Sequence, residues 1–160
     1  MSIETRAQIR ALKKARVVCV GDVMLDRFVY GDVTRISPEG PIPICRVQKE
    51  TAMLGGAGNV VRNLVALGAS VDFISLVGND DIARDVDRLL HDLSGVSHTL
   101  TMESNRPTTS KVRYVAGGQQ LLRADRETTD PVPDAIADIL ASKVEKALRD
   151  AALLVVSDYG

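Results

Sequence analysis

The sequence is poor in aromatic residues and has almost no net charge. It contains no Trp, and its two Phe and three Tyr make up 3% of 160 residues. Proteins that stack single-stranded nucleic acid need aromatic side chains for the purpose. The net charge of -1 at pH 7 gives no electrostatic attraction to nucleic acid or to an anionic membrane. The composition therefore predicts neither kind of partner.

Cysteine and histidine are equally scarce, with two residues of each. Cys19 and Cys45 both lie in apolar runs, which predicts buried free thiols rather than a disulfide framework. His91 and His98 are seven residues apart, with no cysteine or nearby histidine to complete a metal-binding set. We therefore expect no metal site built from these residues.

Long apolar runs are absent as well. No run could span a bilayer, and the N-terminal segment lacks the apolar region of a signal peptide. We therefore expect a cytoplasmic protein. Hydrophobic residues make up 45% of the chain and charged residues 26%, as in ordinary globular proteins. At this length the chain can form one domain with a sizeable core.

Helical and extended patterns alternate along the chain. Their spacing predicts helices over residues 5–15, 59–68, 81–93 and 133–148, with buried strands within 16–22, 71–81 and 152–156. Strand–helix alternation is typical of a mostly parallel sheet with helices on its faces. We therefore expect an α/β fold.

Two stretches interrupt this alternation. Residues 28–49 contain three prolines and short apolar runs without a helical period, and residues 108–123 resemble a hairpin around Ala116-Gly117-Gly118. We interpret both as strands of a small second sheet that projects from the core.

The segment "LGGAGNVVRN", residues 54–63, places glycines before a helix. Such glycines let backbone N–H groups approach an anion or a polar ligand. It matches the dinucleotide fingerprint poorly, because Val61 occupies the third glycine position and no buried strand is expected directly before it. Asn59 could bind a ligand or could simply cap the helix.

The segment "GDVMLD", residues 21–26, follows the first expected strand. Asp22 and Asp26 then lie at the carboxyl end of that strand, where sites form in open α/β sheets. Their carboxylates could accept hydrogen bonds from sugar hydroxyls. Turn and cap chemistry is the alternative for either residue alone.

The segment "SKVRYVAGGQQLLRAD" carries Lys111, Arg113 and Arg123 among apolar residues, which predicts a basic face on the hairpin. Arginine is suited to bidentate contact with phosphate. A solvated strand face is the alternative interpretation. Gln119 and Gln120 add amide donors and acceptors.

Taken in order, several segments resemble the kinase domain of D-glycero-β-D-manno-heptose 7-phosphate kinases, within the ribokinase (phosphofructokinase-B) family. The resemblance runs from about residue 16 to residue 160, and "GDVMLDR", "RISPE" and "QQLLR" are typical of the heptose subgroup. The segments are "GDVMLDRFVYGDVTRISPEGPIPICRV", "GGAGNVVRNLVALGA", "LVGNDD", "RPTTSKVRYVAGGQQLLRAD" and "LLVVSDYG".

The resemblance implies a ribokinase-like three-layer α/β sandwich with a small projecting β lid, and a homodimer formed through the lids. It implies an enzyme, a carbohydrate kinase that uses ATP and Mg²⁺. The γ-phosphate would pass to the anomeric oxygen of heptose 7-phosphate, and the 1,7-bisphosphate would feed ADP-heptose and lipopolysaccharide core synthesis.

The resemblance also implies site residues. The sugar would be held by Asp22, Asp26, Gly55, Gly56 and Asn59, with lid-side contacts from Lys111, Gln120 and Arg123. Many ribokinase relatives place three residues between the glycine pair and the Asn. Here only Ala57 and Gly58 intervene, as in heptose kinases.

The family's catalytic base lies in a Gly-Ala-Gly-Asp motif, which this sequence does not contain. We therefore expect residues 1–160 to be the N-terminal part of one kinase domain, without a catalytic residue or most of the ATP site, and inactive alone. In that case the strand over residues 152–156 would be an exposed apolar edge. The alternatives are another ribokinase-family sugar kinase and a non-catalytic β-lid dimerisation module. Val61 disfavours a dinucleotide-binding oxidoreductase.

Overall fold

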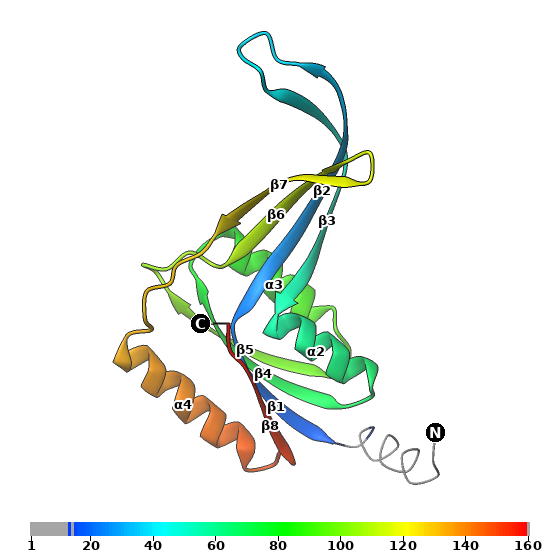
Figure 1. Ribbon diagram of the computed structural model, residues 1–160. Coiled ribbons are helices and arrows are strands. Elements are labelled where there is room, and N and C mark those ends of the chain that lie inside the picture. Colours follow the sequence, from blue (N-terminus) through cyan, green and yellow to red (C-terminus); the bar gives the residue numbers. More distant parts are fainter. Residues whose placement is uncertain (1–12, 14, 160) are drawn as a thin grey trace.

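The computed structural model describes residues 13 and 15–159, which form two four-stranded sheets and three helices (Figure 1). The helix predicted over residues 5–15 lies almost wholly outside the described residues. The strands and helices are β1 (Arg16–Gly21), β2 (Val23–Ile36), β3 (Pro43–Gly56), α2 (Ala57–Ala66), β4 (Ser70–Gly78), α3 (Asp81–His91), β5 (Val96–Glu103), β6 (Ser110–Ala116), β7 (Gln119–Arg126), α4 (Asp134–Leu148) and β8 (Leu153–Ser157).

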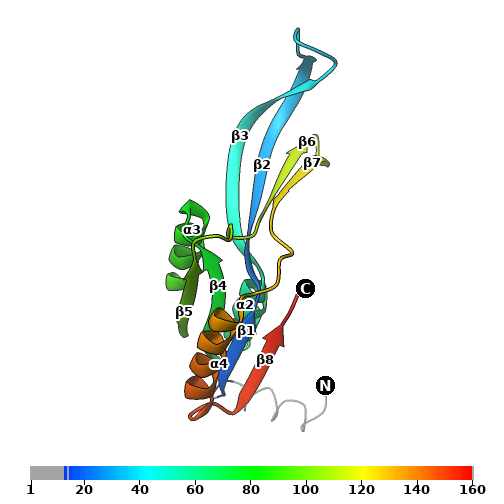
Figure 2. The same cartoon turned by 90° about the vertical axis from the view of Figure 1, so that its left-hand side faces the viewer.

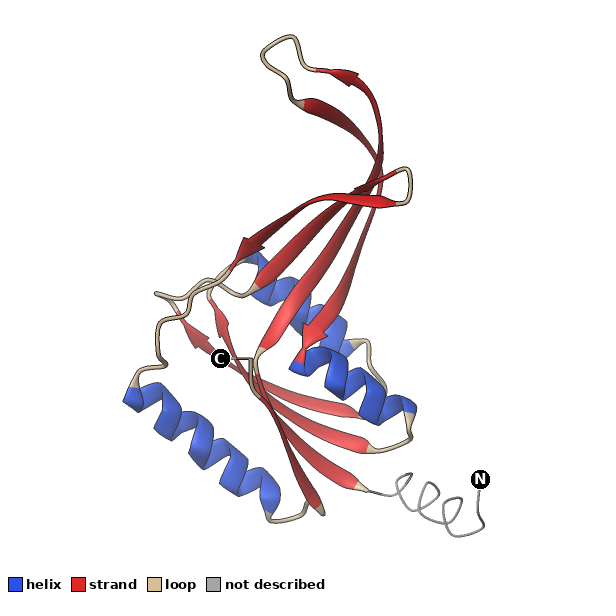
Figure 3. Cartoon of the chain, viewed as in Figure 1, coloured by secondary structure: helices blue, strands red, loops and turns tan. Residues whose placement is uncertain are grey.

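The first sheet is parallel and has the strand order β5-β4-β1-β8. Helices α2 and α3 cover one face, and α4 lies on the other (Figures 1 and 3). The main core lies under α2 and α3, where Phe73 of β4 meets Val61 and Leu90 of the two helices. The predicted α/β fold with helices on both faces of a parallel sheet is confirmed.

Strand β8 has the apolar run of a buried strand, but it lies exposed at the edge of the parallel sheet, as expected for residues 1–160. It pairs only with β1, and Leu154 and Val156 are 38% and 64% exposed. Helix α4 begins at Asp134 as predicted, but none of its residues is buried. Its contacts fall mainly on β4 and β1, so this helix leaves β8 largely open.

The second sheet, which we call the lid, has the order β3-β2-β6-β7 and stands off the first sheet (Figure 2). Asp22 alone separates the end of β1 from the start of β2, so the chain passes from one sheet into the other at this residue. β6 and β7 form the predicted hairpin, and Gly117 and Gly118 both take positive φ in its turn. The projecting second sheet is confirmed.

Two strands differ from the sequence expectation. β5 was not predicted, although its apolar residues Val96, Leu100 and Met102 fall on alternate positions with His98. β3 runs to Gly56 and leads directly into α2, so a strand does precede this helix, although most of that strand is exposed and only its last residues are buried. Most of β3 is exposed lid strand, which is why its pattern did not indicate a buried one.

The two cysteines differ in environment. Cys19 is fully buried on β1, and burial raises the pKa of its thiol to about 11. Cys45 lies on the lid and is only partly buried, which corrects the prediction of a buried thiol. Both are free.

Among the described residues, no helix combines the length and apolar character needed to cross a membrane.

Helix α3 begins at a carboxylate that also holds the loop before the lid. Asp80 Oδ1 accepts a hydrogen bond from the Ala83 backbone N–H at 2.9 Å, and Oδ2 accepts one from the Thr108 N–H at 2.9 Å. Burial alone would raise the pKa of Asp80, but the two hydrogen bonds to its carboxylate outweigh this effect, and the pKa is lowered from its usual value. The ionised form is therefore favoured in the folded protein.

We expect Asp80→Asn to reduce the free energy of unfolding by about 1–2 kcal/mol at pH 7, because an amide has only one oxygen for two backbone donors. A lowered folded-state pKa contributes stability above the unfolded value of about 3.9 and loses it as pH falls through the folded value. The gap between wild type and variant in urea titrations should therefore close below about pH 4. Asp81→Asn, an exposed charge at the same helix end, is the control. A gap that does not change with pH would contradict this role.

Candidate functional site

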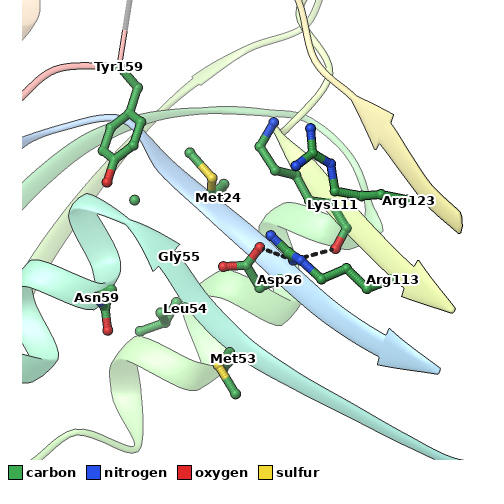
Figure 4. A pocket seen from close by; sticks show the side chains of 11 residues that line it. Met24, Asp26, Met53, Leu54, Gly55, Asn59, Lys111, Arg113, Arg123 and Tyr159 are labelled. Atoms are coloured by element: carbon green, nitrogen blue, oxygen red, sulfur yellow. Dashed lines mark hydrogen bonds and ion pairs between the residues drawn. The ribbon is translucent and has the colours of Figure 1, made fainter. Parts of the chain in front are cut away.

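A pocket of about 440 Å³ lies where the lid meets the N-terminus of α2 (Figure 4). β2, β3, β6, β7, α2 and the segment after β8 all contribute to it. Its walls are formed by Met24, Asp26, Met53, Leu54, Gly55, Gly56, Asn59, Lys111, Arg113, Arg123 and Tyr159. We call it the lid pocket.

The only carboxylate among these lining residues belongs to Asp26 and is held by an arginine. Strands β2 and β6 pair in parallel, with Phe28 opposite Arg113. Arg113 Nη1 donates to Asp26 Oδ1 at 2.6 Å, and its guanidinium lies 5.2 Å from the centre of the Phe28 ring. Both side chains of the ion pair are about four-fifths buried. The orientation of Asp26 is therefore fixed by a charge-assisted hydrogen bond.

The other oxygen of Asp26 lies against Gly55. A Cβ atom at Gly55 would stand 2.3 Å from Asp26 Oδ2 and 2.8 Å from Met24 Cγ. Only a residue without a side chain allows β3 to approach β2 this closely here. Gly55 thus helps to set where the carboxylate sits.

Helix α2 starts without a side-chain cap. Gly56 is its N-cap residue, at φ 55°, and the Ala57 N–H donates to the Asp22 carbonyl at 2.9 Å. Asn59 lies in the first turn and lines the lid pocket instead. The alternative in which Asn59 merely caps the helix is therefore wrong. Its amide can both donate and accept toward a polar ligand.

Two further cations come from the hairpin of the lid. Lys111 Nζ donates to Glu127 at 2.7 Å and to Asp125 at 3.0 Å, and Arg123 also pairs with Asp125 at 2.8 Å. The hydrogen bond to Glu127 is the main cause of a raised pKa at Lys111. The lid therefore presents three cations to the pocket, counting Arg113.

Six of the eight residues predicted for the sugar site line the lid pocket, and two do not. Asp22 lines a neighbouring hollow of about 240 Å³, and its Oδ2 accepts from the Tyr159 N–H at 2.9 Å. Gln120 is exposed on β7. The six are Asp26, Gly55, Gly56, Asn59, Lys111 and Arg123.

Sequence reasoning assigned no site role to several lining residues. The sequence predicts Arg113 only as part of a basic face, although its spacing of two from Lys111 places both on one side of β6. No local sequence signal joins Tyr159 to the lid, because this residue follows β8 of the other sheet. Met24, Met53 and Leu54 form the apolar walls of the pocket, and their sequence pattern does not distinguish them from other apolar residues of a strand.

Within residues 15–159, no three His, Cys, Asp or Glu side chains come together in a group that could hold a metal ion.

Comparison with known proteins places the chain among sugar kinases. Residues 14–159 match the family model described as pfkB family carbohydrate kinase. Two curated relatives, each called bifunctional protein HldE, are 52% identical: one from Paramagnetospirillum magneticum over 153 residues and one from Rhodospirillum rubrum over 152. The matches cover 96% and 95% of this chain but 31% of each relative. The chain thus spans about a third of their length.

Solved structures agree on the fold. A carbohydrate kinase from Agrobacterium tumefaciens has a TM-score of 0.66 at 19% identity, covering 89% of this chain and 45% of that one. Ribokinase from Giardia lamblia has a TM-score of 0.58 at 19% identity, covering 89% and 44%. The expected ribokinase-like architecture is therefore confirmed.

Proposed function

Because the chain belongs to the pfkB family of carbohydrate kinases, we propose that the lid pocket binds the sugar that accepts the phosphoryl group. The acceptor we propose is D-glycero-D-manno-heptose 7-phosphate, phosphorylated on its anomeric oxygen. The resemblance of "GDVMLDR", "RISPE" and "QQLLR" to heptose kinases supports this choice. The product would serve ADP-heptose and lipopolysaccharide synthesis.

The observation that carries the proposal is the composition of the lid pocket. Asp26 and Asn59 supply an acceptor and a donor for sugar hydroxyls, while Lys111, Arg113 and Arg123 supply positive charge for a phosphate. A pocket with a few convergent polar groups is typical of small-molecule sites. Its polar groups thus suit both chemical parts of a sugar phosphate.

We propose that residues 1–160 form the N-terminal, acceptor-binding part of a ribokinase-like kinase domain. ATP with Mg²⁺ would supply the phosphoryl group. Phosphoryl transfer depends mainly on positioning and on neutralising charge, and these residues would position the acceptor. Since the sequence contains no Gly-Ala-Gly-Asp motif, we expect them to bind the sugar without transferring phosphate.

The test of sugar binding is isothermal titration calorimetry of the chain with heptose 7-phosphate. We expect Asp26→Asn to raise the dissociation constant about tenfold, because hydrogen bonds to a charged group contribute about 1.5–3 kcal/mol and the amide keeps part of them. Asp32→Asn is the matched control. Asp32 lies farther along β2, bonded to Gln48 and outside the lid pocket.

Other sugars separate the proposal from its nearest alternative. Tighter binding of fructose 6-phosphate or ribose than of heptose 7-phosphate would favour another sugar kinase of the family. If the wild-type chain binds no sugar or sugar phosphate at millimolar concentration, the proposed function is wrong.

We also propose that two copies associate through the lid. Many of the large hydrophobic side chains that are exposed lie on its strands or on the loop between β2 and β3: Tyr30, Val33, Ile36, Ile42, Val47, Met53, Leu121 and Leu122. Exposed apolar surface on a sheet with open edges is a hazard unless another surface covers it. A second lid would provide that cover.

We expect Leu122→Arg to shift the protein from dimer to monomer in sedimentation velocity, because a buried unpaired charge opposes association. Leu122 is 58% exposed on β7. Leu67→Arg is the matched control, since Leu67 is 49% exposed but follows α2, away from the lid. A wild-type chain that stays monomeric at high concentration would contradict the dimer.

A further inference from the structure

Tyr159 lines the lid pocket although it belongs to neither the lid nor α2. It lies two residues beyond the end of β8. Figure 4 shows its ring at the opposite end of the pocket from Lys111 and Arg123, with the hydroxyl pointing into the pocket on the side of Asn59. The residue is 66% exposed, so much of the ring is open to a ligand.

The backbone of Tyr159 is fixed by Asp22. Its N–H donates to Asp22 Oδ2 at 2.9 Å, and the Asp22 N–H donates to the Ser157 carbonyl at 3.0 Å. The Asp22 carbonyl also accepts from Ala57 N–H at 2.9 Å. One residue therefore joins the ends of β1 and β8 to the start of α2. It sets the position of Tyr159 relative to Asn59, two residues after Ala57.

The chemistry of the ring complements the rest of the pocket. The cations and Asp26 suit the charged and hydroxyl groups of a sugar phosphate, but a sugar ring also has faces covered by C–H groups. Tyrosine combines an apolar face with a hydroxyl that can donate or accept. Both parts of the residue can therefore contact a sugar whose phosphate is turned toward the lid cations.

We propose that Tyr159 is a specificity-determining residue of the sugar site. Its ring packs against a C–H face of the bound sugar, and its hydroxyl bonds to a sugar hydroxyl. Asp22 acts as a positioning residue that holds Tyr159 and the start of α2, rather than as a direct sugar ligand. The inference rests on the proposed function, because it requires the lid pocket to bind a sugar.

The absence of Trp provides a direct readout. Near-ultraviolet difference spectra report on tyrosine alone here, and the chain has only Tyr30, Tyr114 and Tyr159. We expect heptose 7-phosphate to produce a tyrosine difference spectrum that disappears in Tyr159→Phe. Tyr30→Phe and Tyr114→Phe are the controls, because neither residue lines the pocket, and both should keep the signal.

Calorimetry of Tyr159 variants distinguishes the contribution of the ring to sugar binding from that of the hydroxyl. We expect Tyr159→Ala to raise the dissociation constant about tenfold or more, since it removes both contacts, and Tyr159→Phe to raise it about threefold. Asp22→Ala should weaken binding and reduce the difference spectrum. Asp22→Asn should keep most of the affinity and most of the difference spectrum, because its amide oxygen can still accept from the Tyr159 N–H.

Two outcomes would overturn the inference. If the wild-type chain binds the sugar phosphate but Tyr159→Ala binds equally well, Tyr159 has no part in recognition while the proposed function stands. A difference spectrum that survives in Tyr159→Phe would lead to the same conclusion. If the wild-type chain binds no sugar, the proposed function fails, and this inference fails with it.

Discussion

Gly55→Ala is expected to weaken binding of heptose 7-phosphate by about 100-fold, the upper end of what losing a hydrogen bond to a charged group can cost. The added methyl group would stand 2.3 Å from Asp26 Oδ2 and 2.8 Å from Met24 Cγ, closer than atoms can approach. The carboxylate must therefore move away from the position that Arg113 and the pocket give it. The methyl group would also occupy space in the lid pocket.

Calorimetry measures this loss, and circular dichroism shows whether the variant is folded. Gly40→Ala is the matched control, because a Cβ atom there would meet only Ile42 side-chain atoms at 3.8 Å, an ordinary contact. Wild-type affinity in a folded Gly55→Ala protein would mean that Asp26 does not hold the sugar. The position of Asp26 would then need another explanation.

Gly21→Ala is expected to lower the free energy of unfolding by about 3 kcal/mol, the upper end of the range for inserting atoms into a packed region. The new Cβ atom would lie 2.0 Å from the Ser157 carbonyl oxygen and 2.7 Å from its carbon. These are backbone atoms, so no flexible side chain can move aside. Gly21 pairs with Ser157 in the β1–β8 register, and relief requires that pairing to open.

Urea unfolding monitored by circular dichroism tests this expectation. With a denaturant dependence of about 2 kcal/mol per M, the midpoint should fall by about 1.5 M. The Gly40→Ala protein again serves as the control. An unchanged midpoint would show that the end of β8 can separate from β1 without cost, and the attachment of Tyr159 through Asp22 would then be loose as well.

The helices were predictable because their apolar residues recur at helical spacing. Three predicted helices are present, and α3 ends at His91, close to the expected residue 93. The strands were harder to predict, because an apolar run does not reveal its place in a sheet. The apolar run at residues 152–156 indicates a strand but not its neighbour, because β8 pairs with β1, which lies far away in the sequence.

The part of the candidate site that lies in short sequence motifs could be predicted. Asp26, Gly55 and Asn59 stand in two compact segments, and the pairing of β2 with β3 brings these segments together. The ion pair between Arg113 and Asp26 depends on the β2–β6 register. The position of Tyr159 at the lid pocket depends on where β8 ends. Both depend on long-range pairing, which no local pattern specifies.

The central position of β1 has a consequence for how the chain folds during synthesis. Residue 17 pairs with residue 71 on one side and with residue 153 on the other. At about 5–20 residues per second, a ribosome needs roughly 4–15 s to travel from the end of β4 to the start of β8. During that interval one edge of β1 is unpaired and open to other nascent chains. Contacts of such high sequence separation also slow folding, so we expect this protein to depend on chaperones that shield exposed strands.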